Sequence, residues 1–168
     1  MRLALALVVP LAAALLQASV VPFVSVGGAR PNMPLLVAAS WSLAAAPREA
    51  VWWAFWGGLV VDLLSGGPLG AMALASLAPV AAIGLGERQV ARPRSVLTAM
   101  LLVGAATAAA SLIYLAILLA TGQPLADFPA VAGAAVSGGV YNGVLTLAAY
   151  PLARLLQRTT ENQASLGW

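Results

Sequence analysis

The chain has 168 residues, of which 62% are hydrophobic and only 8% are charged, and it contains eight arginines but no lysine, histidine or cysteine. A soluble domain usually carries about a quarter charged residues, so this composition excludes a water-soluble globule and indicates an integral membrane protein. The missing cysteine and histidine exclude disulfides, thiolate chemistry and the commonest general base and metal ligand. The net charge is +3. In a membrane protein an excess of basic residues ordinarily sets the orientation of the helices, so nucleic-acid binding is not expected.

The first apolar segment spans residues 3–26 and follows Arg2. A basic residue before an apolar stretch also begins a signal peptide, but this stretch continues past Leu16 without a small-residue cleavage site and is longer than a typical signal h-region. We therefore expect a retained transmembrane helix.

Five further helices are predicted between glycine, proline and charged joints, and all the connections are short. Their expected ranges are 33–46, 50–64, 69–86, 96–120 and 129–153, so that residues 1–153 form one six-helix transmembrane domain and residues 154–168 a short cytoplasmic tail. The second and third helices fall short of the roughly 20 residues that cross a bilayer. They form either two short spans or a re-entrant hairpin, and the charge pattern favours two spans.

Arginine positions predict the orientation of the chain. If all six helices cross and the N-terminus is cytoplasmic, only Arg30 lies outside. The arginines inside are then Arg2, Arg48, Arg88, Arg92, Arg94, Arg154 and Arg158. This bias obeys the positive-inside rule, so both termini are predicted to be cytoplasmic. Trp52, Trp53 and Trp56 follow Arg48 and are expected to anchor the third helix at the interface.

Asp62 is the one carboxylate inside a predicted span, near the outer end of the third helix. A carboxylate in hydrocarbon needs a partner, and two candidates lie on the same side: the backbone N–H groups of the Ser65 to Gly67 turn, and Arg30. The structural interpretation is that Asp62 fastens the outer loops; the alternative is that it contacts a ligand or partner.

Small and polar residues predict helix contacts. Gly139 and Gly143 form a G-x-x-x-G pattern on the last helix, and Gly104 begins a small and polar face on the fifth. These patterns mark packing within the chain or, alternatively, a homodimer interface. Gln17 and Asn142 lie near the middle of the first and last helices, where a contact between the two helices would satisfy both amides.

No catalytic constellation can be assembled from the five acidic residues and the available hydroxyls. No metal cluster or phosphate-binding glycine loop is present either, so neither a cofactor nor an enzymatic activity is expected. Channels and proton-coupled transporters usually carry several ionisable residues in their spans, which leaves a binding or scaffolding role.

One stretch of sequence is distinctive. It runs from Gly58 through Asp62 to Gly66, Gly67, Pro68 and Gly70, and it resembles the signature of the rod shape-determining MreD family. The chain length, the Arg30-Pro31-Asn32 opening of the second helix, and a last helix with Asn142 and a Tyr150-Pro151-Leu152 ending fit the same pattern.

This resemblance implies an all-α, polytopic bundle similar to the S components of energy-coupling-factor vitamin transporters. It further implies a subunit of the bacterial inner membrane that binds MreC and, through MreC, influences RodA and its partner class B penicillin-binding protein, with MreB on the cytoplasmic side. A substrate-binding S component is the rival interpretation, although the outer loops offer few polar groups for a vitamin. If the scaffold interpretation holds, the second and third helices are expected to seat a partner helix near the outer face.

Overall fold

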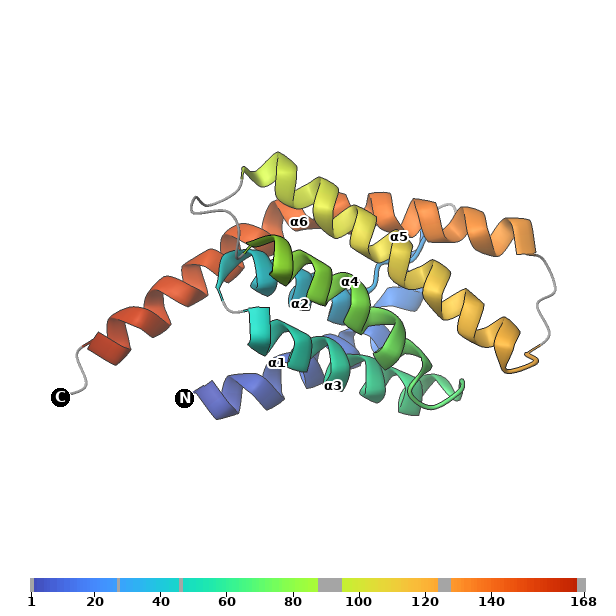
Figure 1. Ribbon diagram of the computed structural model, residues 1–168, viewed down its shortest axis with the longest axis horizontal. Coiled ribbons are helices and arrows are strands. Elements are labelled where there is room, and N and C mark those ends of the chain that lie inside the picture. Colours follow the sequence, from blue (N-terminus) through green and yellow to red (C-terminus); the bar gives the residue numbers. More distant parts are fainter. Residues whose placement is uncertain (1, 27, 46, 88–94, 124–127, 166–168) are drawn as a thin grey trace.

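Six α-helices run back and forth to form one bundle in the computed structural model, which describes residues 2–26, 28–45, 47–87, 95–123 and 128–165 (Figure 1). The helices are α1 (Arg2–Ser19), α2 (Met33–Ala44), α3 (Pro47–Ser65), α4 (Ala71–Glu87), α5 (Val96–Ala120) and α6 (Phe128–Ser165), with a 3-10 turn, η1 (Val21–Phe23), after α1. The described residues form no strand beyond one isolated bridge between Val26 and Ala29. The predicted all-α bundle of six helices is therefore confirmed.

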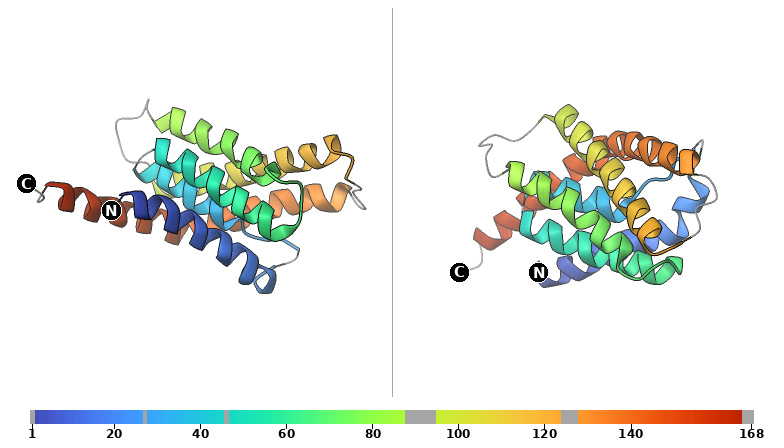
Figure 2. Two further views of the ribbon diagram at one scale, coloured as in Figure 1. Left: turned by 90° about the horizontal axis from the view of Figure 1, so that it is seen from below. Right: turned by 45° about the vertical axis from the view of Figure 1, so that its right-hand side comes forward.

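Two helix ends differ from the predicted ranges. α1 stops at Ser19 rather than near residue 26, because the chain turns through η1, where Pro22 has no N–H to continue the helix. α6 does not stop at residue 153 but continues to Ser165, since no glycine or proline interrupts the chain between Leu152 and Ser165. Its last turns extend beyond the rest of the bundle (Figures 1 and 2).

α2 lies at the centre of the bundle and packs against α1, α3, α4, α5 and α6. It has only 12 residues, nine of them buried, and at 1.5 Å per residue it is about 18 Å long. A helix of this length is too short to match a bilayer of ~30 Å by itself. The surrounding helices replace lipid around it, which explains how so short an apolar helix is accommodated.

The two ends of the bundle differ in charge. α1, α3 and α5 begin at one end, which we call the arginine end because it carries Arg48, Arg154 and Arg158; α2, α4 and α6 begin at the opposite end, where Arg30 is exposed (Figure 1). Arg88, Arg92 and Arg94 lie outside the described residues. The described arginines are thus distributed unequally between the two ends of the bundle, as predicted from their positions in the sequence.

Three helical segments are long and apolar enough to cross a membrane: Leu5–Phe23, Val96–Ala120 and Pro129–Thr159. Met33–Ala44 and Ala71–Gly86 are shorter apolar helices. α3 carries Arg48, Glu49 and Asp62, and both of its carboxylates accept hydrogen bonds from within the chain. Internal pairing is what allows acidic groups to remain in a bundle surrounded by lipid.

Candidate helix-docking site

Asp62 joins the end of α3 to the beginning of α4. Its carboxylate accepts hydrogen bonds from Met72 N–H at 3.0 and 3.1 Å and from Ala73 N–H at 3.3 Å, and the side chain is 2% exposed. The first N–H groups of a helix have no partner within the helix and carry partial positive charge. Asp62 therefore satisfies two of these donors, and the helix in turn stabilises the buried carboxylate.

The glycines around Asp62 make this contact possible. A Cβ at Gly58 would lie 2.6 Å from Ala73 Cα, so only glycine lets α3 approach α4 one turn before the carboxylate. The chain then reverses through Gly66 and Gly70, whose φ angles of +69° and +87° suit glycine, and Pro68 O accepts the N–H of Ala71 at 3.1 Å. The distinctive stretch of sequence is thus one unit: a close helix contact, a carboxylate and a reversal that aims α4 at it.

The partner of Asp62 differs from both sequence candidates. The donors come from the first turn of α4, not from the amides of Ser65 to Gly67, and no ion pair joins Asp62 to Arg30, which is exposed. Two backbone N–H groups occupy the carboxylate, which supports the structural interpretation over ligand contact.

Asn142 holds the beginning of α2 against α5 and α6. Its Oδ1 accepts the N–H of Asn32 at 3.1 Å, and its Nδ2 donates to Asn32 O at 3.0 Å and to Thr107 Oγ1 at 2.9 Å. Asn32 in turn caps α2 by accepting Leu35 N–H at 3.2 Å. Asn142 is fully buried, so its amide needs partners within the protein, and Asn32 and Thr107 from two other segments provide them.

The expected contact between Gln17 and Asn142 is absent. Gln17 Oε1 instead accepts the N–H of Met33 at 2.8 Å, so both amides bind the beginning of α2. The reason is the position of α2: among the described residues, α1 and α6 do not pack against each other, because α2 lies between them. A pattern on two helices could not reveal that a third separates them.

Three glycines bring α5 and α6 into close contact. A Cβ at Gly139 would lie 2.7 Å from Gly104 O, and one at Gly143 would lie 3.1 Å from Met100 O. The G-x-x-x-G pattern therefore serves packing within the chain, in the manner of small-residue helix contacts in membranes.

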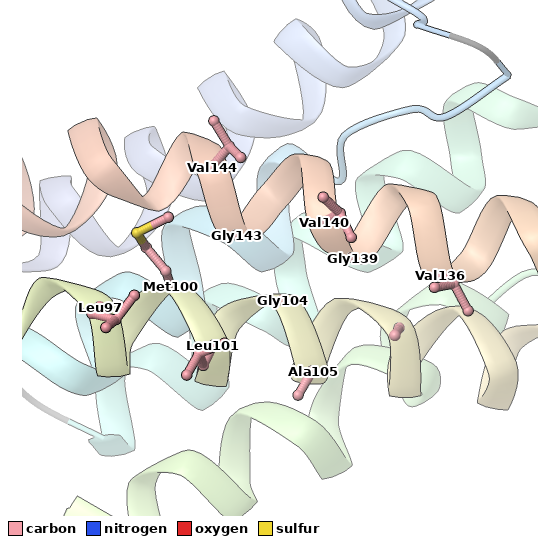
Figure 3. A pocket seen from close by; sticks show the side chains of 11 residues that line it. Leu97, Met100, Leu101, Gly104, Ala105, Val136, Gly139, Val140, Gly143 and Val144 are labelled. Atoms are coloured by element: carbon pink, nitrogen blue, oxygen red, sulfur yellow. The ribbon is translucent and has the colours of Figure 1, made fainter.

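The same glycines form the floor of an open apolar groove on the outside of α5 and α6, with a volume of about 380 Å³ (Figure 3). Side chains that are more than half exposed rise on both sides, among them Leu101 on α5 and Val136 and Val140 on α6. The remaining lining residues are Leu97, Met100, Ala105, Ala108 and Val144. A low backbone floor between apolar rims has the shape that accepts a ridge of side chains from another helix.

The tryptophans of α3 do not share one role. Trp52 and Trp56 are 59% and 41% exposed, which suits interfacial anchors, but Trp53 is buried and stacks on Trp41 with ring centroids 4.7 Å apart. Trp41 Nε1 donates to Glu49 Oε2 at 3.1 Å. The expectation of an anchor is therefore wrong for Trp53, which faces the bundle interior.

α3 exposes Leu63 and Leu64 near its end at Ser65, but α2 adds no open surface to the seat expected on the second and third helices. α2 is enclosed by its neighbours and presents no continuous outer face, whereas the groove on α5 and α6 is open. Sequence reasoning named Gly104, Gly139 and Gly143 but not the groove, because its rims are ordinary leucines and valines. In the described part of the chain, no three His, Cys, Asp or Glu side chains gather where they could hold a metal ion.

Of the comparisons with known proteins, the one with protein families gives a match, and it agrees with the resemblance noted at the Gly58 to Gly70 stretch. No curated protein and no solved structure matches this chain, so the likeness to the S-component fold stays an expectation. The family model described as rod shape-determining protein MreD matches residues 1–159. The chain therefore belongs to the MreD family of bacterial membrane proteins that determine rod shape.

Proposed function

We propose that this protein is a non-enzymatic scaffold of the rod elongation machinery, which binds the single transmembrane helix of MreC and through it influences peptidoglycan synthesis by RodA and a class B penicillin-binding protein. Family membership supports the role in cell shape. The groove on α5 and α6 carries the proposal of a docking surface, since it is apolar, elongated and open to the membrane.

Lipid tails are as apolar as leucine side chains, so burying a leucine between two membrane helices gives no hydrophobic gain. Helices in membranes therefore associate through close packing. The glycine floor lets a partner backbone approach, and the exposed rims of Leu101 and Val140 can interdigitate with its side chains. An S component would instead need a cavity with several convergent polar groups, and the lining of this groove consists of glycine and apolar residues.

The proposal includes a topology. All six helices cross the inner membrane, with both termini and the arginine end in the cytoplasm on the side of MreB filaments. The unequal distribution of the described arginines supports this orientation. Fusions of a periplasmic reporter to the 121–123 turn and to residue 165 test it: the first should be active and the second silent.

Cysteine crosslinking tests the docking surface, because the natural chain contains no cysteine. Val140→Cys and Leu101→Cys should crosslink to cysteines placed along the MreC helix. Leu74→Cys on α4, which is also more than half exposed, is the matched control and should not. Equal crosslinking at Leu74, or crosslinks between two copies of this chain at Val140 when MreC is present, would contradict the proposal.

A blocking variant gives an independent test. Ala105→Phe fills the groove from an exposed position, so the amount of MreC that copurifies should fall at least tenfold. Ala82→Phe on the exposed face of α4 changes the same residue type away from the groove and should leave copurification unchanged. Normal copurification with Ala105→Phe would place the partner elsewhere.

A further inference from the structure

Cavities at the arginine end differ in their lining. One, with a volume of about 210 Å³, lies between α1 and α6 and is lined by apolar side chains together with Ser40, Trp41 and Trp53. Another, of about 180 Å³, lies between the beginning of α3 and the end of α4, which run side by side in opposite directions (Figure 1). Its lining includes a charged residue, Arg48, so we call it the Arg48 cavity.

A glycine lets the two walls of the Arg48 cavity approach each other. A Cβ at Gly84 would lie 2.7 Å from Pro47 Cβ, so a larger residue would push the end of α4 away from the beginning of α3. Both Gly84 and Pro47 line the cavity, and this contact fixes the backbone that carries Arg48 beside an apolar wall. The remaining lining residues are Val51 of α3 and Ala81 and Leu85 of α4.

Arg48 brings a free positive charge to this cavity. The side chain is exposed, and within the described part of the chain it forms no ion pair and no hydrogen bond. Glu49, the acidic residue of the same turn, accepts a hydrogen bond from Trp41 Nε1 at 3.1 Å and does not line the cavity. The cavity therefore presents a guanidinium whose N–H donors match the geometry of phosphate oxygens.

The surroundings of Arg48 are those of a lipid rather than of a soluble anion. Leu85 on the α4 side is 61% exposed, and Trp52, four residues after Arg48 on α3, is 59% exposed. A basic residue where a transmembrane helix begins lies at the depth of the lipid headgroups, and the apolar walls then lie deeper, beside glycerol and acyl carbons. A cavity of 150 Å³ holds one benzene, so the Arg48 cavity holds about seven carbons. A soluble phosphate would leave these apolar walls uncovered.

We propose that the Arg48 cavity binds an anionic phospholipid of the leaflet at the arginine end. Arg48 binds the phosphate, while Val51, Ala81 and Leu85 pack against the glycerol and the first acyl carbons. The ligand is a diacylglycerol phosphodiester with net negative charge, because a zwitterionic lipid offsets its phosphate with its own ammonium group. The site shares no residue with the groove on α5 and α6, and it does not depend on the proposed scaffold function.

Fluorescence quenching of Trp52 tests the proposal in the full-length protein. Helical side chains lean toward the N-terminus of their helix, so Trp52 covers the turn that carries Arg48 and reports the lipid there. Trp56→Phe and Trp168→Phe remove two other tryptophans, and the same protein with Trp52→Phe added gives the contribution of the buried tryptophan pair, which is subtracted. In nanodiscs that mix phosphatidylcholine with phosphatidylglycerol, quenching by the brominated form of each lipid gives their relative affinity at Trp52.

Phosphatidylglycerol should be preferred at Trp52 by roughly fivefold, which is what one basic residue at a membrane surface contributes. Arg48→Gln should abolish this preference. Arg158→Gln is the matched control, since Arg158 is an exposed arginine of the same end that does not line the cavity, and it should leave the preference unchanged. Equal affinities of the two lipids, or equal losses in the two arginine variants, would overturn the proposal.

A second pair of variants locates the site. Ala81→Phe fills the cavity and should lower the preference for phosphatidylglycerol, while Ala82→Phe on the neighbouring exposed position should not. An unchanged preference in Ala81→Phe would place the lipid elsewhere and overturn the proposal, and Arg48→Gln, at an exposed position, remains decisive if Ala81→Phe does not fold. An excess of inorganic phosphate at constant ionic strength should leave the preference unchanged, whereas its loss would assign the cavity to a soluble anion instead.

Discussion

The two ends of the bundle differ in how far their buried polar groups are hydrogen-bonded. At the end where α2 and α4 begin, Asp62, Gln17 and Asn142 accept backbone N–H groups of other segments, and Asn32 caps its own helix, α2. At the arginine end, Trp41 Nε1 donates to Glu49 Oε2, but Ser40 Oγ and Trp53 Nε1, which belong to residues bordering a cavity, have no hydrogen-bond partner among the described residues. One end is therefore fastened by hydrogen bonds, and the other has internal space.

This difference indicates where hydrogen bonds hold the helices in place and where the packing leaves space. Hydrogen bonds to the first turns of two helices fix the positions of α2 and α4, and leaving such donors unpaired away from water is costly. A cavity costs packing contacts unless something fills it. Variants at the two ends should accordingly have effects of different size and, in one case, of opposite sign.

The largest effect is expected at Asp62. Asp62→Ala leaves the N–H groups of Met72 and Ala73 without an acceptor and should lower the free energy of unfolding by about 3 kcal/mol. Asp62→Asn keeps one acceptor and should lose about half as much. Denaturant titration in mixed micelles measures both, with Leu63→Ala, an exposed neighbour, as the control. A loss no larger than that of Leu63→Ala would show that the cap contributes little.

Asn142→Leu should have the next largest effect, a loss of about 2 kcal/mol in the free energy of unfolding, because it removes the partners of Asn32 and Thr107 together. Gln17→Leu removes one bond, to Met33 N–H, and should cost about 1 kcal/mol. The order of the two losses is the test, since both variants replace an amide by a leucine. Equal losses would mean that the network around Asn142 is no stronger than a single bond.

Close contact between α5 and α6 predicts a moderate effect. In Gly139→Ala the new Cβ meets backbone at 2.7 Å and should lower the free energy of unfolding by about 1 to 3 kcal/mol. Gly133→Ala on the same helix meets nothing within 4 Å and should be neutral or stabilising by up to about 1 kcal/mol. Thermal unfolding of the pair in one detergent separates packing from helix propensity. Similar midpoints for the two variants would contradict the contact.

The smallest effect, with the opposite sign, is expected at the cavity. Ser40→Ala removes a buried hydroxyl that has no partner among the described residues, so the free energy of unfolding should rise by up to about 1 kcal/mol. Thr107→Ala also removes a buried hydroxyl, but one that accepts from Asn142 Nδ2, and should be destabilising. A measured loss in Ser40→Ala would indicate that this hydroxyl has a partner in the membrane.

The Gly58 to Gly70 stretch shows how far sequence reasoning reached. The carboxylate, the reversal and the glycines were all recognisable, because they are neighbours in the chain and their chemistry is local. The actual donors, the N–H groups of Met72 and Ala73, could not be identified from the sequence. Every residue except proline carries a backbone N–H, so any nearby amide could have been the donor. The same limit applies to Asn142, whose main partner, Asn32, is 110 residues away.

By itself, the sequence determined the solvent, the helix count and the family. The low charge and the long apolar segments require a lipid environment, and in lipid the backbone N–H and C=O groups must be paired within helices. The Gly58 to Gly70 stretch indicates the family. Only the tertiary structure decided that α2 is central, that Gln17 and Asn142 both bind its beginning, and that α5 and α6 form a groove while α1 and α6 leave a cavity. The physical reason is that the hydropathy of each segment, which decides whether it forms a membrane helix, is a local property of the chain. The partners of polar groups and the positions of cavities depend instead on which helices become neighbours in the bundle.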